Sequence, residues 1–363
     1  MELLTLNRVL AVLDGLETGG YKNFLNYSIV RYMVEQPDNI LAQMYTAVLK
    51  QRPTMDIVTL VCTMAGALHY TATNLLDIDK AVEVFNCREQ FDSFVRKNYA
   101  EIQQLALSRR TNSTIPQRAF PLACFLPNDD SEIGLLELGC SRGDMGLVLQ
   151  NLELILAHSS KYLFPNFRTK VHKEKLQYAK SIKRYFGVDL DISVDDAWLL
   201  ALWGLEDDRR KQLVNFYGDF KPNETLFFYR LQADACKLME YITLLQSFFA
   251  DSNVIVILTS FMLYQLSLER RLSLFKTIQM ITCKLSQKEG SQRSVLWFNQ
   301  GIAPQDLLSG TFDYARCYFS RLWFEDGALV ASPIARLFND ACEGWEELVE
   351  PLVFVHKPKR IAP

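Results

Sequence analysis

Short apolar runs alternate with helical segments from residue 133 onward, and this alternation most constrains the fold of the 363-residue chain. Polar turn residues flank each run, and the runs are rich in Val, Ile, Leu and Phe. Such runs are typical of parallel strands that are buried on both faces. The runs are Ile133–Leu138, Phe186–Leu190, Leu226–Tyr229, Val254–Leu258 and Val295–Phe298. Strands that alternate with helices predict an α/β fold with a doubly wound sheet.

The first third of the chain has a different pattern. Residues 1–120 carry apolar side chains at three- and four-residue steps, without the alternation of a strand. The polar, turn-forming stretch Pro127–Ser131 precedes the first apolar run. We therefore predict an all-helical domain over 1–120 and a sheet domain over 121–363.

Composition and charge exclude several classes of protein. The net charge is −3 and the basic residues are scattered, whereas binding to nucleic acid or an anionic membrane needs a basic stripe. The eight cysteines form no Cys-x-x-Cys pair and no dense framework, which disfavours a disulfide scaffold. The four histidines lie apart from other residues that bind metals, which disfavours a metal site. The N-terminus lacks a cationic signal region, and the longest apolar run, Val254–Tyr264, is too short for a bilayer. We expect a cytoplasmic protein with a small-molecule partner, no metal, no nucleic acid and no membrane; the oligomeric state stays open.

The first apolar run leads into a turn that contains two glycines. Glu137 lies near the end of the run, and Gly139 and Gly143 flank Cys140 and Ser141 ahead of a helix that starts near Asp144. Glycine permits a tight turn and the close approach of a ligand, to which the helix N-terminus presents free N–H groups. Ser141 stands where a dinucleotide motif has its middle glycine, so a dinucleotide is disfavoured. The alternative is a loop that only packs the helix on the strand.

Acidic residues follow the second and third runs. Asp189, followed by Leu190, ends the second run, where a carboxylate accepts hydrogen bonds from a ribose diol. It lies 46 residues after Gly143, and an insertion near Tyr162–Lys173 explains why this exceeds the usual spacing of about 20. After the third run, Ala233 and Asp234 are placed either to bind an adenine amino group or to cap a helix.

The fourth strand end and the segment before the first strand supply the other candidate residues. Ser260 and Tyr264 follow the fourth run, but no evident general base does. A capping serine and a packed aromatic are the alternative interpretation of this pair. Before the first strand, the polar segment Ser108–Arg118 contains arginines, and Arg118 is a candidate to bind a carboxylate with its forked guanidinium.

An antiparallel feature is predicted near the C-terminus. Tyr318–Phe324 and Ala328–Ala331 flank Glu325-Asp326-Gly327, which predicts a β-hairpin. A mostly parallel, Rossmann-like sheet that ends in an antiparallel hairpin resembles the class I methyltransferases. The Glu-x-Gly-x-x-x-Gly turn also resembles the form of this loop that binds S-adenosylmethionine, with Glu137 and the glycines around its methionine part.

The chain as a whole resembles an uncharacterised bacterial domain-of-unknown-function family with a class I S-adenosylmethionine methyltransferase-like core. The resemblance covers nearly the whole chain. It rests on the segment ending in Arg118, Leu136–Ser141, Gly187–Leu190, Asp195–Trp203 with Arg209, Ser260 with Arg270 and Arg271, and Glu343–Trp345. The chain departs from the family at Thr111–Ile115, which lacks the Asn and Glu that end this segment in the family, and at Arg142, which replaces small residues.

The resemblance implies S-adenosylmethionine as the cofactor. Its expected binding residues are Arg118, Glu137, Gly139, Cys140, Ser141, Gly143, Asp189, Leu190, Ala233 and Asp234. The expected reaction is methyl transfer to a small molecule by proximity, with the helical domain as a lid and with Ser260, Tyr264 and Tyr21 as catalytic candidates. One alternative is cyclisation of S-adenosylmethionine itself to azetidine-2-carboxylate, with release of methylthioadenosine. The other is a cofactor-binding module without turnover.

Overall fold

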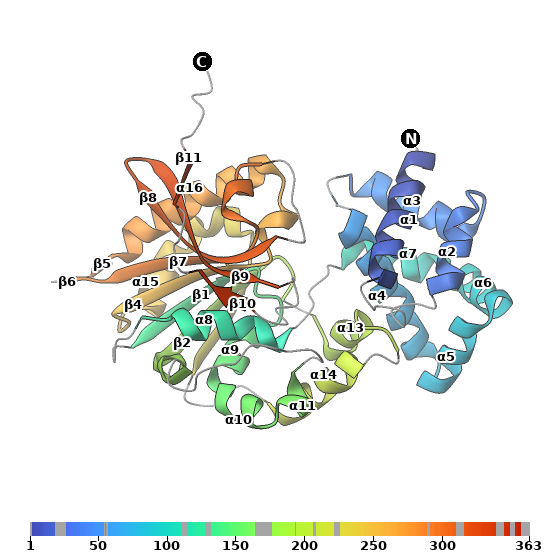
Figure 1. Ribbon diagram of the computed structural model, residues 1–363, viewed down its shortest axis with the longest axis horizontal. Coiled ribbons are helices and arrows are strands. Elements are labelled where there is room, and N and C mark those ends of the chain that lie inside the picture. Colours follow the sequence, from blue (N-terminus) through green and yellow to red (C-terminus); the bar gives the residue numbers. More distant parts are fainter. Residues whose placement is uncertain are drawn as a thin grey trace, which may run out of the picture. The chain divides into compact units, whose positions relative to one another are not determined.

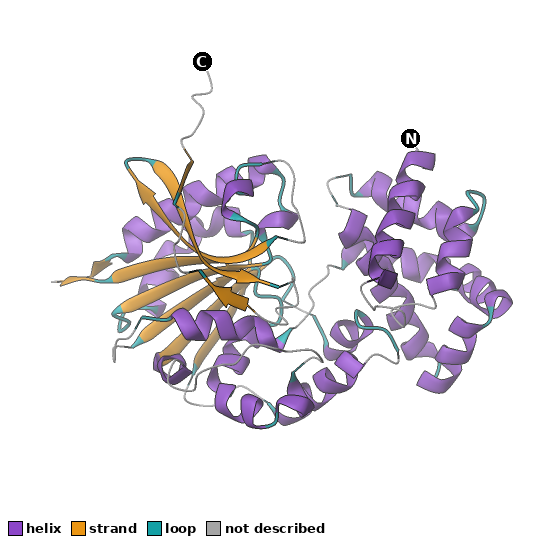
Figure 2. Ribbon diagram, in the orientation of Figure 1, coloured by secondary structure: helices purple, strands orange, loops and turns teal. Residues whose placement is uncertain are grey.

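The computed structural model has a mixed α/β architecture with one large sheet (Figure 2). It describes residues 2–18, 27–53, 55, 57–109, 115–127, 132–163, 176–192, 194–205, 208–220, 226–288, 291–309, 316–338, 345–348 and 353–356. The chain forms two compact units. The first comprises Met1–Thr114 and Ser193–Tyr217, and the second comprises Ile115–Ile192 and Gly218–Pro363.

The first unit is helical in all its described elements, as the periodicity predicts. Its helices are α1 (Glu2–Thr18), α2 (Tyr27–Glu35), α3 (Ile40–Gln51), α4 (Ile57–Leu75), α5 (Ile78–Asn86), α6 (Arg88–Lys97), α7 (Tyr99–Ser108), α13 (Asp196–Ala201) and most of α14 (Asp208–Asp219). Helix α4 is the central element, and it packs against α1, α3, α5, α7 and α13. It is buried along most of its length because it is apolar on nearly every side.

Residues 193–217 belong to the helical unit, whereas the sequence pattern assigned them to one continuous sheet domain. Trp198 of α13 is fully buried, and its ring lies close to Gly66 of α4. The His69 ring nitrogen Nδ1 lies 2.9 Å from the Ala201 carbonyl oxygen. The apolar face of α13 was visible in the sequence, but the partner that buries it is set by tertiary contacts.

The second unit is built on a nine-stranded sheet (Figure 1). Its strands are β1 (Ile133–Leu138), β2 (Ile182–Asp189), β3 (Phe227–Gln232), β4 (Val254–Ser260), β7 (Ser294–Gly301), β8 (Cys317–Glu325), β9 (Ala328–Leu337), β10 (Trp345–Glu347) and β11 (Phe354–His356). The order is β10-β9-β8-β7-β4-β1-β2-β3, and β11 pairs with β9. Strands β3, β2, β1, β4 and β7 are parallel, which confirms all five predicted strands. A separate two-stranded sheet joins β5 (Gln287–Lys288) and β6 (Ser291–Gln292).

The predicted C-terminal hairpin is also confirmed. Strands β8 and β9 pair in antiparallel fashion, and β8 pairs with β7 in the same way. Asp326 and Gly327 join β8 to β9 with φ angles of 48° and 77°. Positive φ at both residues is the geometry that suits a two-residue hairpin turn, and Asp-Gly is a favoured sequence for it.

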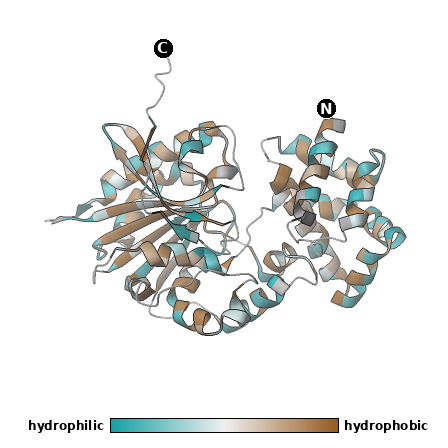
Figure 3. Cartoon of the chain, in the orientation of Figure 1, coloured by the Kyte–Doolittle hydropathy of each residue, from teal (hydrophilic) through white to brown (hydrophobic). Residues whose placement is uncertain are grey.

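Helices cover both faces of the sheet. The elements of this unit that contain helices are η1 (Pro116–Arg118), α8 (Ala119–Phe125), α9 (Asp144–Gln150), α10 (Leu152–Ala157), α11 (Ser159–Tyr162), η2 (Gln177–Ser181), η3 (Ala235–Tyr241), α15 (Ile242–Phe248), η4 (Leu263–Gln265), α16 (Leu268–Leu285) and η5 (Pro304–Asp306). One face packs against α15 and α16 through a core that includes Leu136, Phe186, Ile257 and Ile278. The opposite face packs against α9. Figure 3 shows that the central strands are hydrophobic, as double-sided burial requires.

Strand β3 departs from the prediction of a fully buried strand. Phe227 and Tyr229 have exposed fractions of 61% and 41%. The reason is that β3 is the last strand of the sheet and pairs only with β2. An apolar composition predicts a strand, but its place at the sheet edge depends on the order of all the strands.

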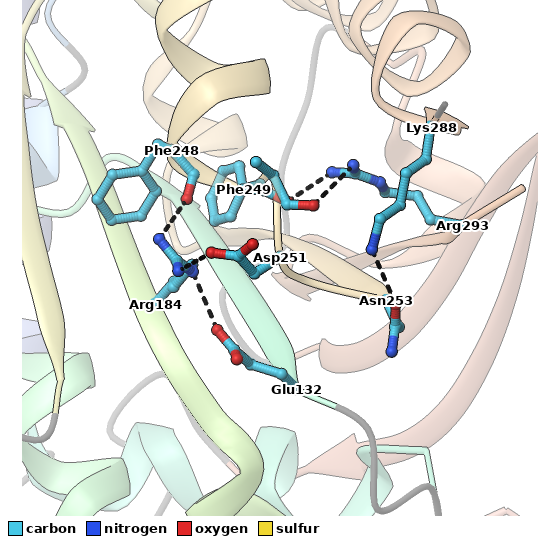
Figure 4. Close-up of polar contacts among 9 residues, drawn as sticks. Glu132, Arg184, Phe248, Phe249, Asp251, Asn253, Lys288 and Arg293 are labelled. Carbon is cyan, nitrogen blue, oxygen red and sulfur yellow. Dashed lines mark hydrogen bonds and ion pairs between the residues drawn. The ribbon is translucent and has the colours of Figure 1, made fainter. Parts of the chain in front are cut away.

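An arginine joins three elements at the amino ends of the strands (Figure 4). Arg184 of β2 donates from Nε to Glu132 over 2.9 Å and from Nη1 to the Phe248 carbonyl over 2.9 Å. It also pairs with Asp251 through Nη2. Nearby, Lys288 makes one hydrogen bond of 3.1 Å to Asn253. Arg184 thus binds three polar groups, whereas this bond joins Lys288 to one.

We expect Arg184→Met to lower the free energy of unfolding by about 2–3 kcal/mol, because it leaves a carbonyl and two carboxylates without their partner. Lys288→Met, the matched control, is expected to change it by less than about 0.5 kcal/mol. Urea unfolding curves measure both. Equal effects of the two substitutions would show that the Arg184 contacts do not stabilise the sheet.

None of the helices in the described part of the chain is long and apolar enough to cross a membrane.

Candidate functional site

The candidate site lies at the carboxyl ends of β1, β2 and β4. The strand order reverses direction between β1 and β4, and doubly wound sheets bind ligands in the crevice at such a point. The loop after β1 is attached to β2, since the N–H groups of Gly139 and Cys140 donate to the Val188 carbonyl over 2.8 and 3.2 Å. Helix α9 begins at Asp144, directly after Gly143.

Three residues of this loop adopt the left-handed conformation. The φ angles are 78° at Gly139, 52° at Ser141 and 86° at Gly143. A Cβ atom on Gly143 would lie 2.6 Å from the Phe228 ring, and one on Gly139 would lie 3.0 Å from Met262. Packing against Phe228 thus requires glycine at 143, and the positive φ favours glycine at both positions. This agrees with the alternative raised from the sequence, and ligand approach stays a prediction. Ser141 is a non-glycine residue at a strained backbone position, a feature that clusters at functional sites.

The Asp189 carboxylate holds this loop in place. Its Oδ2 accepts a hydrogen bond of 2.7 Å from the Ser141 N–H, and its Oδ1 accepts one of 3.1 Å from the Asp191 N–H. Leu190 follows with a partly exposed side chain. Helix α13 is capped by Asp195, whose side chain accepts from the Trp198 N–H.

Glu137 is buried beneath the loop, with an exposed fraction of 4%. The Tyr185 hydroxyl donates a hydrogen bond to its Oε2. Burial raises the pKa of Glu137 to about 8, against the opposing effect of the Tyr185 hydrogen bond, and the Asp144 and Asp189 carboxylates raise it further. Glu137 is therefore mostly protonated at neutral pH. Cys140 is buried as well, and burial raises the pKa of its thiol, which keeps it neutral.

The raised pKa of Glu137 predicts a specific dependence of stability on pH. Between the unfolded pKa near 4.5 and the folded pKa of about 8, the folded state holds a proton that the unfolded state has lost. The contribution of Glu137 to stability is thus complete below pH 4.5 and falls as the pH rises to 8. We expect Glu137→Gln to remove this fall in stability. The free energy of unfolding of the variant, relative to that of the wild type, should therefore rise by roughly 1 kcal/mol per pH unit between pH 4.5 and 8.

Denaturant unfolding at pH 5, 6, 7 and 8 measures the effect. Parallel curves of stability against pH for the two proteins would contradict protonation of Glu137 in the folded state.

Asp234 caps a helix in this structure. Its Oδ1 accepts from the Cys236 N–H over 3.0 Å at the start of η3, and Arg270 pairs with the carboxylate at 2.7 Å. The capping interpretation from the sequence therefore accounts for Asp234. Contact of Asp234 or Ala233 with an adenine ring stays a prediction.

Ser260 and Arg118, which the sequence separates widely, are brought together by Gln300. The Ser260 hydroxyl donates to Gln300 Oε1 and Gln300 Nε2 donates to the Arg118 carbonyl, each over 3.0 Å. The Arg118 guanidinium lies 3.9 Å from the centre of the Phe261 ring. Phe261 itself has a φ of 49°, so a second strained residue lies at this edge. The Tyr264 side chain and all of Tyr21 lie outside the described residues.

Three residues of this edge were not selected from the sequence. Gln300 is fully buried at the end of β7, and Gln117 is fully buried in η1. Tyr185 covers Gly146 of α9 and contacts Glu137. A polar residue beside an apolar run, as Gln300 is beside Val295–Phe298, is the one signal that the sequence offered.

The chain matches no family model and no curated protein in comparisons with known proteins. Within the described ranges, no group of three or more His, Cys, Asp or Glu side chains is arranged to hold a metal ion. None of the seven cysteines in those ranges forms a disulfide bond.

Proposed function

We propose that this chain is an S-adenosylmethionine-dependent transferase that methylates a small molecule. The observation that carries the proposal is the Asp189 carboxylate, which lies at the carboxyl end of β2 and is bonded to the glycine loop after β1. In doubly wound folds an acid at this place binds a ribose diol next to such a loop. The resemblance to a family with a methyltransferase-like core supports the same cofactor.

The residues at this edge fit the chemical parts of S-adenosylmethionine. Asp189 offers two acceptor oxygens to the ribose, and the partly exposed Leu190 offers apolar surface to the adenine. The Ser141 Oγ atom is buried and has no hydrogen-bond partner among the described residues. Arg118 carries a positive charge at the same edge for the carboxylate end. Cys140 contributes its backbone, because its side chain is buried against Gly187.

Bound S-adenosylmethionine supplies a methyl group that is activated by its sulfonium. The chain's own contribution is to fix the reacting groups in position and to exclude water, which by itself lowers the barrier substantially. Ser260 orients Gln300 and the Arg118 backbone rather than presenting a base. Protonated Glu137 adds no full negative charge next to the ligand's carboxylate.

The hydrogen bonding of Ser260 favours a second candidate reaction. Its hydroxyl is already donated to Gln300, and within the described part of this strand end no side chain is placed as a general base. Cyclisation uses S-adenosylmethionine as the only substrate: a C–N bond forms between its amine and its γ-carbon, and the C–S bond breaks. The amine first loses one proton to water, so that its lone pair can attack, and methylthioadenosine then carries away the C–S electron pair. The product is azetidine-2-carboxylate.

Mass spectrometry of the purified chain with S-adenosylmethionine separates these reactions. Methyl transfer predicts S-adenosylhomocysteine only when a cell extract supplies an acceptor. Cyclisation predicts methylthioadenosine and azetidine-2-carboxylate without extract. Binding without either product would indicate a cofactor-binding module, and no binding at all would refute the proposal.

A further inference from the structure

Gln300 is a buried glutamine near the end of β7 that bonds to two other elements of the candidate site. Its exposed fraction is 0%. Its Oε1 atom accepts from the Ser260 hydroxyl at the end of β4, and its Nε2 group donates to the Arg118 carbonyl at the end of η1, each over 3.0 Å. Its own backbone carbonyl accepts a hydrogen bond of 2.7 Å from the Phe261 N–H. One residue therefore joins β4, β7 and η1.

The Phe261 ring is held in a defined place. Phe261 has a φ of 49°, a strained conformation for a bulky residue that persists only where the surroundings enforce it. It is only 3% exposed, and its N–H is fixed by the Gln300 carbonyl. Gly301 has a φ of 123°, and a Cβ atom there would lie 3.2 Å from the ring. The ring therefore packs directly against the backbone at the end of β7.

The Arg118 guanidinium lies over this ring, 3.9 Å from its centre. Arg118 is partly exposed, unlike the phenylalanine beneath it. A guanidinium that stacks on an aromatic face keeps its N–H groups in one plane, where they fit the two oxygens of a carboxylate. Two contacts that place Arg118 therefore depend on Gln300. The Gln300 side chain holds the Arg118 carbonyl, and the Gln300 backbone holds the residue that supports the guanidinium.

We infer that Gln300 is a positioning residue that holds the Arg118 guanidinium where it binds the carboxylate of S-adenosylmethionine, an inference that rests on the proposed function. Gln300 is buried, so it acts through Arg118 and not by contact with the ligand. A long side chain that is already fixed loses less conformational entropy when it binds, so its fixation raises the affinity. The competing interpretation is that Gln300 only stabilises the strand ends. That role would not distinguish ligands with a carboxylate from ligands without one.

Two ligands separate these roles. S-adenosylhomocysteine and methylthioadenosine share the adenosine and the thioether sulfur, but only the first has the carboxylate. We expect Gln300→Leu to weaken S-adenosylhomocysteine binding by about 10-fold in calorimetric titration, and methylthioadenosine binding by less than about 3-fold. Arg118→Met is expected to give the same selective loss. In the Arg118→Met background, Gln300→Leu should change the affinity for S-adenosylhomocysteine by less than about 3-fold, because its effect acts through the guanidinium.

Asn299→Leu is the matched control. Asn299 precedes Gln300 in β7, is 1% exposed and also has two side-chain hydrogen bonds. It accepts from the Thr259 hydroxyl over 3.1 Å and donates to the Ile302 carbonyl over 3.2 Å, and neither bond involves Arg118. Asn299→Leu is expected to lower the unfolding temperature about as much as Gln300→Leu. Neither ligand affinity should change by more than about 3-fold in this variant.

Gln300→Met repeats the titrations with a flexible apolar side chain, should the leucine variant not fold. Equal weakening of both ligands by the Gln300 variants, or weakening of neither, would overturn the inference and leave the proposed function intact. Further loss of S-adenosylhomocysteine affinity in the Arg118→Met background would overturn it as well. A wild-type chain that binds neither ligand would overturn both the inference and the proposed function.

Discussion

Replacing Asp189 with alanine is expected to weaken S-adenosylmethionine binding by about 100-fold. The substitution removes two charge-assisted acceptors for the ribose diol. It also removes the bond of 2.7 Å from the Ser141 N–H that holds the glycine loop in its left-handed conformation. Both losses act on the same ligand. Isothermal titration calorimetry with the folded variant measures the change.

Two further substitutions at this strand end separate the two effects. Asp191→Ala keeps the backbone N–H that residue 191 donates to Asp189. The affinity of this variant for S-adenosylmethionine is therefore expected to fall by less than about 3-fold. Asp189→Asn retains an oxygen for the Ser141 N–H but loses the charge, and its affinity is expected to lie between that of the wild type and Asp189→Ala. If Asp191→Ala lost as much affinity as Asp189→Ala, the assignment of Asp189 to the ribose would be wrong.

Arg271→Met is expected to have the largest effect on stability, a loss of about 3–5 kcal/mol in the free energy of unfolding. Arg271 is only 3% exposed. Its Nε donates to the Leu266 carbonyl over 3.0 Å, and its Nη1 donates to the carbonyls of Asp306, Leu307 and Ser309 over 2.9–3.2 Å. Methionine fills much of the volume but donates to none of these carbonyls, and within the described ranges only that of Asp306 keeps another donor, the Ser309 N–H. Urea unfolding measures the loss.

The preceding residue provides the matched control. Arg270 is 45% exposed at its side chain and pairs with Asp234 on the surface. Arg270→Met is expected to cost less than about 1 kcal/mol, because solvent screens an exposed ion pair. A similar loss for the two adjacent arginines would show that burial of Arg271 among carbonyls is not what stabilises this region.

The strands and the hairpin were predictable because their signals are local. An apolar run between polar turns predicts a buried strand wherever it lies, and Asp326-Gly327 suits a tight hairpin. The exposed edge position of β3 and the packing of Trp198 in the helical unit were not predictable. Both depend on contacts between segments that are far apart in the sequence.

The candidate site was predictable to the same extent. The places of Gly139, Gly143 and Asp189 followed from strand ends and turn residues, and the structure brings them together. The burial of Gln117 and Gln300 did not follow, because a glutamine is usually exposed and only the packed chain encloses it. For Ser260, the hydrogen bond to Gln300 was likewise hidden in the sequence.

Calorimetric titration of the wild-type chain with S-adenosylmethionine tests the central claim most directly, with NAD as the control ligand. The proposal predicts saturable one-to-one binding of S-adenosylmethionine and none of NAD, since Ser141 replaces the middle glycine of a dinucleotide loop. A folded chain that shows no saturable binding of S-adenosylmethionine, or that binds NAD instead, would contradict it.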